Sequence, residues 1–227
     1  MQHNEQVLET QTLTKDDPAH YVALHIKIAK RGLDVFCSII ALIFTALILP
    51  FIAIAIKMES KGPIFFTQTR IGRCTAQHSV LFSMIKFRTM RTDAEKDGPQ
   101  WASENDTRIT RIGLFLRKTR IDELPQFIKV LKGDMSVVGP RPERPVFYQK
   151  LENDIPLYSD RTFGLKPGIT GLAQVNQGYD VTIEDVRSKL LYDHSYALSL
   201  SQFKAWLLMD LHIMYKTVMV VINKKGQ

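Results

Sequence analysis

The sequence has little cysteine: Cys37 and Cys74 are its two thiols in 227 residues. Two cysteines build no disulfide framework and fit a reducing compartment, and no zinc-ligand spacing accompanies them. The chain also has no internal repeat, no low-complexity tract, and no RNP or helix-turn-helix signature. Few aromatic residues interleave its basic clusters, which argues against a single-stranded nucleic-acid binder. These absences disfavour a secreted disulfide scaffold, a zinc module and the common nucleic-acid-binding folds.

Positive charge is in excess. Lysine and arginine number 30 against 23 acidic residues, which gives a net charge of +7 and a pI near 9.4. A balance of this kind predicts an anionic partner. Because nucleic acid is disfavoured, phosphate-bearing small molecules and acidic lipid are the remaining classes. A length of 227 residues fits one domain with a short appendage.

One long apolar run, Val35–Ile56, contains no charged residue. As a helix it would extend about 33 Å, enough for the hydrocarbon core of a bilayer. It begins too late, and lacks the cleavage site, for a signal peptide. Pro50 removes an amide donor from the run and predicts a bend. Cationic residues flank both ends, so two interpretations stay open: a re-entrant helix that returns to the same face, or a transmembrane anchor.

A β-hairpin is predicted after the apolar run. Ile64–Arg70 and Val80–Phe87 are β-branched and aromatic, and the loop Ile71–His78 joins them. Alternation places Lys86 and Arg88 on one face of the second strand. The two cations are either a phosphate clamp or a solvated strand edge.

An acidic pair, Asp122-Glu123, stands at a predicted helix start. Pro125 in the first turn and Gly133 at the end are typical boundary residues. The apolar positions recur at helical spacing and predict a buried stripe: Leu124, Phe127, Ile128 and Leu131. Acids at a helix start commonly cap the helix, so Asp122 is either an N-cap or a catalytic carboxylate.

An arginine locked between prolines follows about one helix later. Met135–Gly139 predicts a short strand that ends at Pro140-Arg141-Pro142. Flanking prolines restrict the backbone and so aim the arginine. A preorganised guanidinium is the preferred bidentate ligand for phosphate. Arg141 therefore strengthens the catalytic interpretation of the acidic pair.

Two amides follow a Pro- and Gly-rich turn, Lys166–Gly171. Such a turn lets the backbone approach a ligand closely, although a plain tight turn has the same composition. Gln174 and Asn176 are suited to reading a base or sugar hydroxyls. The turn lacks the spacing of a Walker loop.

Two further segments predict helices at a membrane interface. Ile109–Arg120 is amphipathic and rich in arginine. Ala205–Ile222 is largely apolar but carries Asp210 and other polar residues, which disfavour a second crossing. We expect Trp206 and Tyr215 to be interfacial anchors of this helix.

These features form an ordered set of motifs along the chain. In order they are Lys30-Arg31-x-x-Asp34, the Pro-broken apolar segment, Gly62-Pro63-Ile64-Phe65-Phe66-x-Gln68, Lys86-Phe87-Arg88-Thr89-Met90, Asp122-Glu123-Leu124-Pro125-Gln126, Lys132-Gly133-Asp134-Met135-Ser136, Val138-Gly139-Pro140-Arg141-Pro142, Lys166-Pro167-Gly168-Ile169-Thr170-Gly171 and Ala173-Gln174-Val175-Asn176. Each motif alone is weak, but the ordered set is highly specific. It resembles the bacterial sugar transferase family, the monotopic phosphoglycosyl transferases.

The resemblance implies an activity. Family members transfer a sugar 1-phosphate from a UDP-sugar to a polyprenyl phosphate, usually undecaprenyl phosphate, and release UMP, which initiates capsule, exopolysaccharide, O-antigen or related glycan assembly. It implies an aspartate nucleophile, matched by Asp122, with Glu123 completing the dyad and Mg²⁺ held at this pair. The substrate-binding residues would be Lys86, Arg88, Arg141, Gln174 and Asn176. The alternative is a catalytically inert, nucleotide-binding membrane scaffold, and the intact acidic pair argues against it.

The resemblance also favours the re-entrant form of the membrane helix, kinked at Pro50 and opening to the cytoplasm of a bacterial inner membrane. We predict a helix-rich α+β monotopic membrane protein with a small β-hairpin and amphipathic interfacial helices. Its parts would be a flexible tail over residues 1–20, a membrane-associated segment over 21–57 and a cytosolic catalytic domain over 58–227. The chain lacks the N-terminal transmembrane helices of larger relatives, so we expect a minimal catalytic form, and a homo-oligomer is compatible with the sequence.

Overall fold

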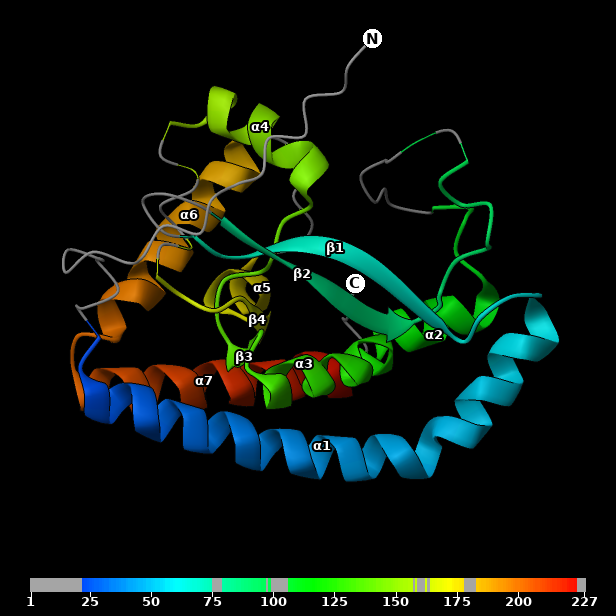
Figure 1. Ribbon diagram of the computed structural model, residues 1–227, viewed down its shortest axis with the longest axis horizontal. Coiled ribbons are helices and arrows are strands. Elements are labelled where there is room, and N and C mark those ends of the chain that lie inside the picture. Colours follow the sequence, from blue (N-terminus) through cyan, green and yellow to red (C-terminus); the bar gives the residue numbers. More distant parts are fainter. Residues whose placement is uncertain are drawn as a thin grey trace, which may run out of the picture.

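A computed structural model describes residues 22–74, 79–96, 98, 106–156, 158, 162, 164–177 and 183–223, and the tail predicted over residues 1–20 lies outside them. The elements are α1 (Leu24–Glu59), β1 (Phe65–Cys74), β2 (Ser79–Phe87), α2 (Arg111–Lys118), the 3-10 helix η2 (Ile121–Gln126), α3 (Phe127–Lys132), β3 (Ser136–Val138), α4 (Pro145–Asp154), β4 (Gly168–Thr170), α5 (Leu172–Asn176), α6 (Ile183–Ser199) and α7 (Phe203–Ile222) (Figure 1). The helix-rich α+β class with a small hairpin is confirmed.

Helix α1 is a single helix of 36 residues with Pro50 inside it. Figure 1 shows it along the bottom of the molecule and bent, so that its last turns rise at the right. Its exposed side carries large apolar residues, among them Phe36, Ile39, Ile40, Ile43, Phe44, Leu47, Phe51 and Ile54. An apolar surface of this extent is unfavourable in water and marks a membrane or protein contact. By length and composition, α1 and α7 are the two described helices that could cross a membrane.

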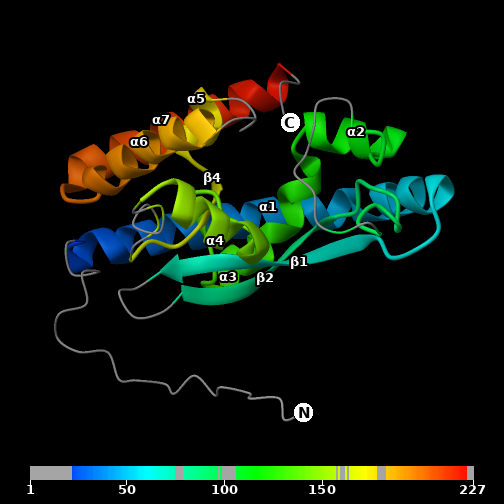
Figure 2. The same ribbon diagram turned by 90° about the horizontal axis from the view of Figure 1, so that it is seen from above.

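The predicted β-hairpin is confirmed, with one correction. Strands β1 and β2 pair antiparallel in a register that sets Phe65 opposite Phe87. The first strand does not end at Arg70, because Ile71 still pairs with Leu81 and the strand continues to Cys74. Burial explains the extension, since both Ile71 and Cys74 pack inside. Seen from above, the hairpin and α7 lie on either side of α1 (Figure 2).

The helix predicted to start at Asp122 begins differently. Arg120, at φ +56°, turns the chain into the 3-10 helix η2, and Asp122 lies within η2 rather than at a cap. The predicted buried stripe is also wrong, because Ile128 and Leu131 are each 39% exposed while Val130 is buried. A 3-10 helix has three residues per turn, so the sequence before and after Gln126 does not share one 3.6-residue stripe.

The end of α3 and the short strand after it are as predicted. Gly133 adopts φ +95°, and its amide donates to the carbonyls of Lys129 and Val130. Strand β3 pairs in parallel with β4, which occupies part of the predicted turn. Gly139 and Gly168 make this pairing possible, because a Cβ on Gly168 would lie 2.2 Å from the Gly139 amide nitrogen. Two glycines thus bring the Pro140–Pro142 segment and the α5 segment together.

The main core lies where α1, α6 and α7 meet β3, and it contains Ile26, Val138, Tyr196, Trp206 and Ile213. Trp206 is 1% exposed, so its predicted role as an interfacial anchor is wrong. The reason is a buried acceptor, because the Trp206 indole N–H donates to Asp210 Oδ2 at 2.9 Å. Tyr215, on another face of α7, is 65% exposed and remains available for an interface.

Asp210 connects three helices within this core. Lys30 of α1 donates to Asp210 Oδ2 at 2.8 Å and also to the Val138 carbonyl at 3.0 Å. The Tyr196 hydroxyl of α6 donates to Asp210 Oδ1 at 3.0 Å. With the Trp206 bond, the buried carboxylate is fully satisfied, as a buried charge must be. The network therefore fixes α1 against the domain that carries β3.

Replacing Asp210 should destabilise the fold strongly. Asp210→Ala leaves Lys30 without its counter-charge and the buried Trp206 N–H without an acceptor, while Tyr196 keeps the Val138 carbonyl, a loss of roughly 3–5 kcal/mol. Glu184→Ala is the matched control, because its ion pair with Arg187 is exposed on both sides and should contribute less than about 1 kcal/mol. Thermal unfolding in detergent micelles measures both. Equal melting temperatures for the two variants would contradict this role of Asp210.

Candidate active site

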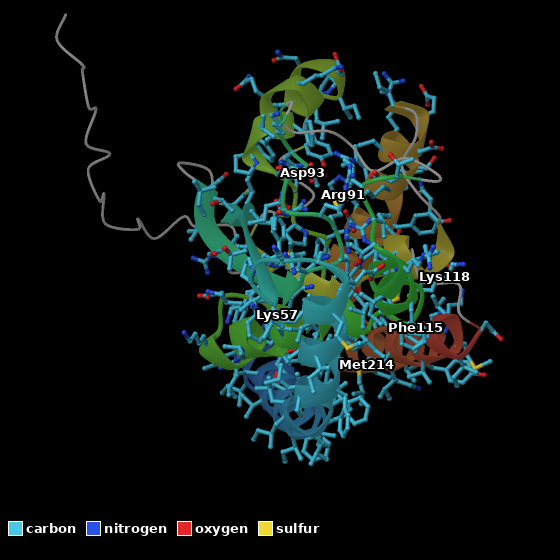
Figure 3. All side chains as sticks on the ribbon, turned by 90° about the vertical axis from the view of Figure 1, so that its right-hand side faces the viewer. Lys57, Arg91, Asp93, Phe115, Lys118 and Met214 are labelled. Carbon is cyan, nitrogen blue, oxygen red and sulfur yellow. The ribbon has the colours of Figure 1, made fainter. Side chains whose placement is uncertain are left out.

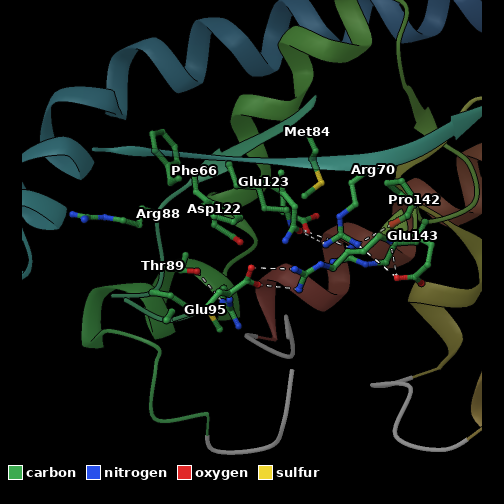
Figure 4. Close-up of a pocket in the computed structure, with 18 of the residues that line it drawn as sticks. Phe66, Arg70, Met84, Arg88, Thr89, Glu95, Asp122, Glu123, Pro142 and Glu143 are labelled. Atoms are coloured by element: carbon green, nitrogen blue, oxygen red, sulfur yellow. Dashed lines mark hydrogen bonds and ion pairs between the residues drawn. The ribbon is translucent and has the colours of Figure 1, made fainter. Parts of the chain in front are cut away.

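A cavity of about 460 Å³ opens between the β-hairpin, η2, the Pro140–Pro142 segment and helices α4 to α6 (Figure 4). Its size suits a nucleotide-sized ligand. Ten cationic side chains line it: Arg70, Lys86, Arg88, Arg91, Arg108, Arg117, Arg120, Arg141, Arg144 and Lys189. Four carboxylates accompany them: Glu95, Asp122, Glu123 and Glu143. The excess of positive charge fits an anionic ligand.

The acidic pair lies in the cavity wall, and the two carboxylates have different surroundings. Glu123 Oε1 accepts from Lys86 Nζ at 2.7 Å and from Arg141 at 3.3 Å, and Glu123 Oε2 lies 3.7 Å from an Arg120 nitrogen. Asp122 is only 6% exposed, yet its carboxylate has no ion pair or hydrogen bond with any residue that the structure describes. In Figure 4 the Asp122 side chain is directed into the cavity. Glu123 is therefore neutralised, and Asp122 is open to a ligand.

The pKa values of the two groups move in opposite directions. Burial raises the pKa of Asp122 to about 6, an effect that Lys86 opposes and Glu123 reinforces. Burial would also raise the pKa of Glu123, but Lys86, Arg141 and Arg120 outweigh it and hold that pKa well below the usual range. Two neighbouring acids whose pKa values are pushed apart are typical of a functional site. Glu123 is therefore ionised at neutral pH, and Asp122 changes its protonation state close to neutral pH.

Lys86 and Arg141 are brought together with the acidic pair, as the sequence predicted. Both contact Glu123, although Lys86 is 37 positions away in the chain and Arg141 is 18 positions away. Rigid flanking prolines and the end of β2 fix the two positions. Burial lowers the pKa of Lys86, and Glu123 opposes that effect.

Arg88 takes a different position. Its guanidinium donates to the carbonyls of Lys61 at 2.6 Å and Ser60 at 2.8 Å, at the end of α1. Arg88 thus borders the cavity but ties the end of α1 to strand β2. Its contribution to ligand binding stays a prediction: each terminal nitrogen donates one hydrogen to a carbonyl, and its buried Nε has no partner among the described residues.

The two predicted amides are separated. Gln174 lines the cavity, donates to the Ile169 carbonyl at 3.2 Å and has a buried Oε1 without a partner among the described residues. Asn176 does not line the cavity; it donates to the Leu172 carbonyl and accepts from Lys216. The structure therefore places Gln174, rather than Asn176, where a ligand can reach it.

Among the cavity arginines that the sequence analysis did not assign to the site, two lie close to the residues that it did assign. Arg120 precedes the acidic pair and takes the left-handed conformation, which swings it back toward Glu123. Arg70 lies at the centre of β1 with a side chain that is 15% exposed. Its place two residues after Gln68, on the same face of the strand, was the available signal.

The acidic residues of the cavity offer Mg²⁺ a partial set of ligands. The described residues contain no group of three or more histidines, cysteines or acids that could hold a metal alone. Mg²⁺, however, is commonly bound by one or two carboxylates together with substrate phosphates and water. The unpaired carboxylate of Asp122 fits such a partial site. Glu123 fits it less well, because its oxygens already face three cations.

The profile of the family described as bacterial sugar transferase matches residues 25–224. The chain belongs to this family. The match covers nearly all of α1, the hairpin, the acidic pair and α7.

Similarity to curated proteins also indicates this family. The chain is 42% identical over 198 residues to the UDP-N-acetylgalactosamine-undecaprenyl-phosphate N-acetylgalactosaminephosphotransferase of Aeromonas hydrophila, covering 87% of this chain and 44% of that protein. It is 48% identical over 146 residues to a putative undecaprenyl-phosphate N-acetylgalactosaminyl 1-phosphate transferase of Bacillus subtilis, covering 63% and 75%. It is 39% identical over 207 residues to the exopolysaccharide production protein PSS of Rhizobium leguminosarum, covering 87% and 96%. The chain thus spans less than half of the Aeromonas relative and nearly all of the Rhizobium one.

Neutralising each acid should change stability in opposite directions at pH 8. The folded-state pKa of Asp122, about 6, lies above its ordinary value of 3.8, so its ionisation destabilises the fold as pH rises through this window. Asp122→Asn should therefore gain about 1–3 kcal/mol at pH 8 and roughly half as much at pH 5, which lies inside the window.

Glu123→Gln is the matched control. The depressed pKa of Glu123 means that its carboxylate stabilises the fold at every pH above its usual value. Removing it leaves Lys86 and Arg141 without a counter-charge, so this variant should melt at a lower temperature at pH 8. Melting curves without added metal at the two pH values decide the point. A shift of the same sign for both variants at pH 8 would be inconsistent with the assigned protonation states.

Proposed function

We propose that the chain transfers a sugar 1-phosphate from a UDP-sugar to a polyprenyl phosphate, such as undecaprenyl phosphate, and releases UMP. One observation carries this proposal: the buried carboxylate of Asp122, which has no ion-pair partner among the described residues, opens into a cationic cavity beside the long apolar helix α1. The names of the relatives from Aeromonas and Bacillus, which specify undecaprenyl phosphate as acceptor, support it. The name of the Rhizobium relative supports a role in exopolysaccharide production.

The transfer would proceed in two displacements. An Asp122 carboxylate oxygen attacks the sugar-bearing phosphorus of the UDP-sugar, the bond from that phosphorus to the UMP oxygen breaks, and UMP leaves with the electron pair. A phosphate oxygen of the lipid then attacks the same phosphorus and releases the Asp122 carboxylate. Lys86 and Arg141 would take part directly, because their positive charges stabilise the negative charge that develops on the transferred phosphoryl group in each step.

Mg²⁺ is part of the proposal. Asp122 and the substrate's phosphates would hold the ion, with Glu123 beside them, and the bound ion would neutralise the diphosphate so that a carboxylate can approach it. Glu123 has its own role in either case. Its ionised carboxylate holds Lys86 and Arg141 in the cavity wall, where they wait for the substrate.

Helix α1 would enter and leave the membrane on the same side. Pro50, by removing an amide donor, accounts for a bend of this kind. Arg88 holds the carbonyls of Ser60 and Lys61 beside the cavity, so the returning end of α1 has to lie with the catalytic domain. Figure 3 places Phe115 and Met214 nearer to the lower, apolar side and Arg91 and Asp93 farther from it. We place this domain on the cytoplasmic side of a bacterial inner membrane, where UDP-sugars are available.

Activity should depend on Asp122 and on the lipid. Purified protein in lipid nanodiscs, given Mg²⁺, undecaprenyl phosphate and a panel of UDP-sugars, should release UMP with at least one of the sugars. Asp122→Asn should lower that rate by about a thousandfold or more, because a carboxamide is a poor nucleophile. Asp134→Asn, an exposed acid paired with Lys129, is the control and should keep the wild-type rate. UMP release by Asp122→Asn near the wild-type rate would refute the proposal.

The re-entrant arrangement should appear in cysteine accessibility. In a variant without Cys37 and Cys74, single cysteines placed at Ala29 and Met58 should react with a membrane-impermeant reagent from the same, cytoplasmic side. Pro50→Leu restores the missing amide donor and should increase the fraction in which Met58 is reached from the opposite side. Labelling of the two positions from opposite sides in the wild-type background would leave a transmembrane anchor instead.

A further inference from the structure

Arg70 is a cavity residue whose side chain is held from the strand below it. Its terminal nitrogens donate to the Gln68 side-chain oxygen at 2.7 Å and to the Pro142 carbonyl at 3.2 Å. A carboxylate oxygen of Glu143 lies 3.8 Å away, which is long for an ion pair. The side chain is 15% exposed and lines the cavity. Arg70 thus arrives at the Pro-Arg-Pro segment from a strand 71 residues earlier in the chain and is fixed there before any ligand binds.

The polar contacts of Arg70 are incomplete. Its Nε is buried and has no hydrogen-bond partner among the described residues. Burial lowers the pKa of Arg70 to about 10, and the like charges of Arg141 and Arg144 contribute to this. The group is still charged at neutral pH, so the fold keeps a desolvated cation beside two others. A buried cation cluster with a free donor is typical of an anion-binding site.

The positions of the cationic side chains along the cavity wall indicate where a bound anion would lie. Lys86, Arg120 and Arg141 all pair with Glu123, the neighbour of Asp122. Arg70 is next, beside Arg141, and Arg144 lies beyond it in the bond to Glu95. The row therefore leads away from the nucleophile. In a displacement by Asp122, the phosphate that leaves lies on the side of the attacked phosphorus away from the nucleophile.

We propose that Arg70 is a substrate-binding residue that contacts the phosphate of the departing nucleotide, next to Arg141. This inference rests on the transfer function proposed above. It assigns the two guanidiniums to one phosphate, which Arg70 meets with its free Nε–H and Arg141 with its terminal nitrogens. The developing negative charge on UMP is then stabilised at the bond that breaks.

A purely positioning role is the competing explanation. Through the Pro142 carbonyl, Arg70 could act only by aiming Arg141. The two roles differ in a double-mutant cycle, because a residue that acts only through Arg141 has no further effect once Arg141 is gone.

The test measures the affinity of UMP for the full chain in lipid nanodiscs by titration calorimetry. Arg70→Gln should weaken UMP binding about tenfold in the wild-type background and by a similar factor in the Arg141→Gln background. Arg73→Gln, on the same strand but outside the cavity, is the control and should change the affinity less than twofold.

Two outcomes overturn the inference: an Arg70→Gln effect below twofold, or an effect that disappears in the Arg141→Gln background. If Arg70→Gln does not fold, Arg70→Lys decides. Lysine keeps the charge but loses the fork, so at least a threefold loss of UMP affinity is expected and an unchanged affinity would overturn the inference. Wild-type protein that releases UMP but shows no Arg70 effect refutes only this inference, whereas wild-type protein that neither binds UMP nor releases it refutes the transfer function itself.

Discussion

The ion-pair cluster around Glu123 is the interaction on which the rest of the site depends. One buried carboxylate collects Lys86 from β2, Arg141 from the Pro-Arg-Pro segment and Arg120 from the turn before η2. Three segments that are distant in the sequence are thereby fixed around one point. Since Glu123 neutralises the cations, the adjacent Asp122 is left buried and without an ion-pair partner among the residues that the structure describes. The fold therefore holds an unfavourable buried carboxylate at this position.

Helix α1 is connected to the candidate site by two sets of hydrogen bonds. Arg88 holds the end of α1, and the Glu59 carboxylate accepts from the amides of Arg111 and Ile112 at the start of α2. Helix α2 leads directly into Arg120 and the acidic pair. The position of α1 is therefore linked to the acidic pair through two short connections. Under the proposed function, these connections would hold the site at the height of a lipid phosphate.

Much of the fold could be predicted from local patterns. The apolar run, the hairpin, the Gly133 helix end and the strand before Pro140 each depend on neighbouring residues, and the structure has all four. The direction of the α3 stripe could not be predicted, because the left-handed Arg120 and the 3-10 geometry of η2 change the helical register. Trp206 was misplaced because its acceptor, Asp210, becomes buried only through Lys30, which lies 180 positions earlier in the chain.

The site residues were likewise predicted in part: those in recognisable local motifs were found, and those positioned by distant contacts were not. Asp122, Glu123, Lys86 and Arg141 carry recognisable motifs and do meet in the cavity. Arg88 alternates correctly with Lys86 along the strand, but strand alternation contains no information about the carbonyls at the end of α1 that its guanidinium binds. Arg70 was missed for the converse reason, since its neighbours in space, Arg141 and Pro142, are about seventy residues away in sequence. Long-range pairing, not residue type, decides such roles.

The central claim is that Asp122 becomes covalently loaded. The most direct measurement is intact-protein and peptide mass spectrometry after incubation with the UDP-sugar that supports UMP release, with Mg²⁺ and without the lipid acceptor. The account predicts about one UMP released per protein and a sugar-phosphate mass on the peptide that contains Asp122. Adding undecaprenyl phosphate should then discharge it. UMP release that requires the acceptor, with no adduct at any time, would contradict the account and indicate a direct transfer between the two substrates.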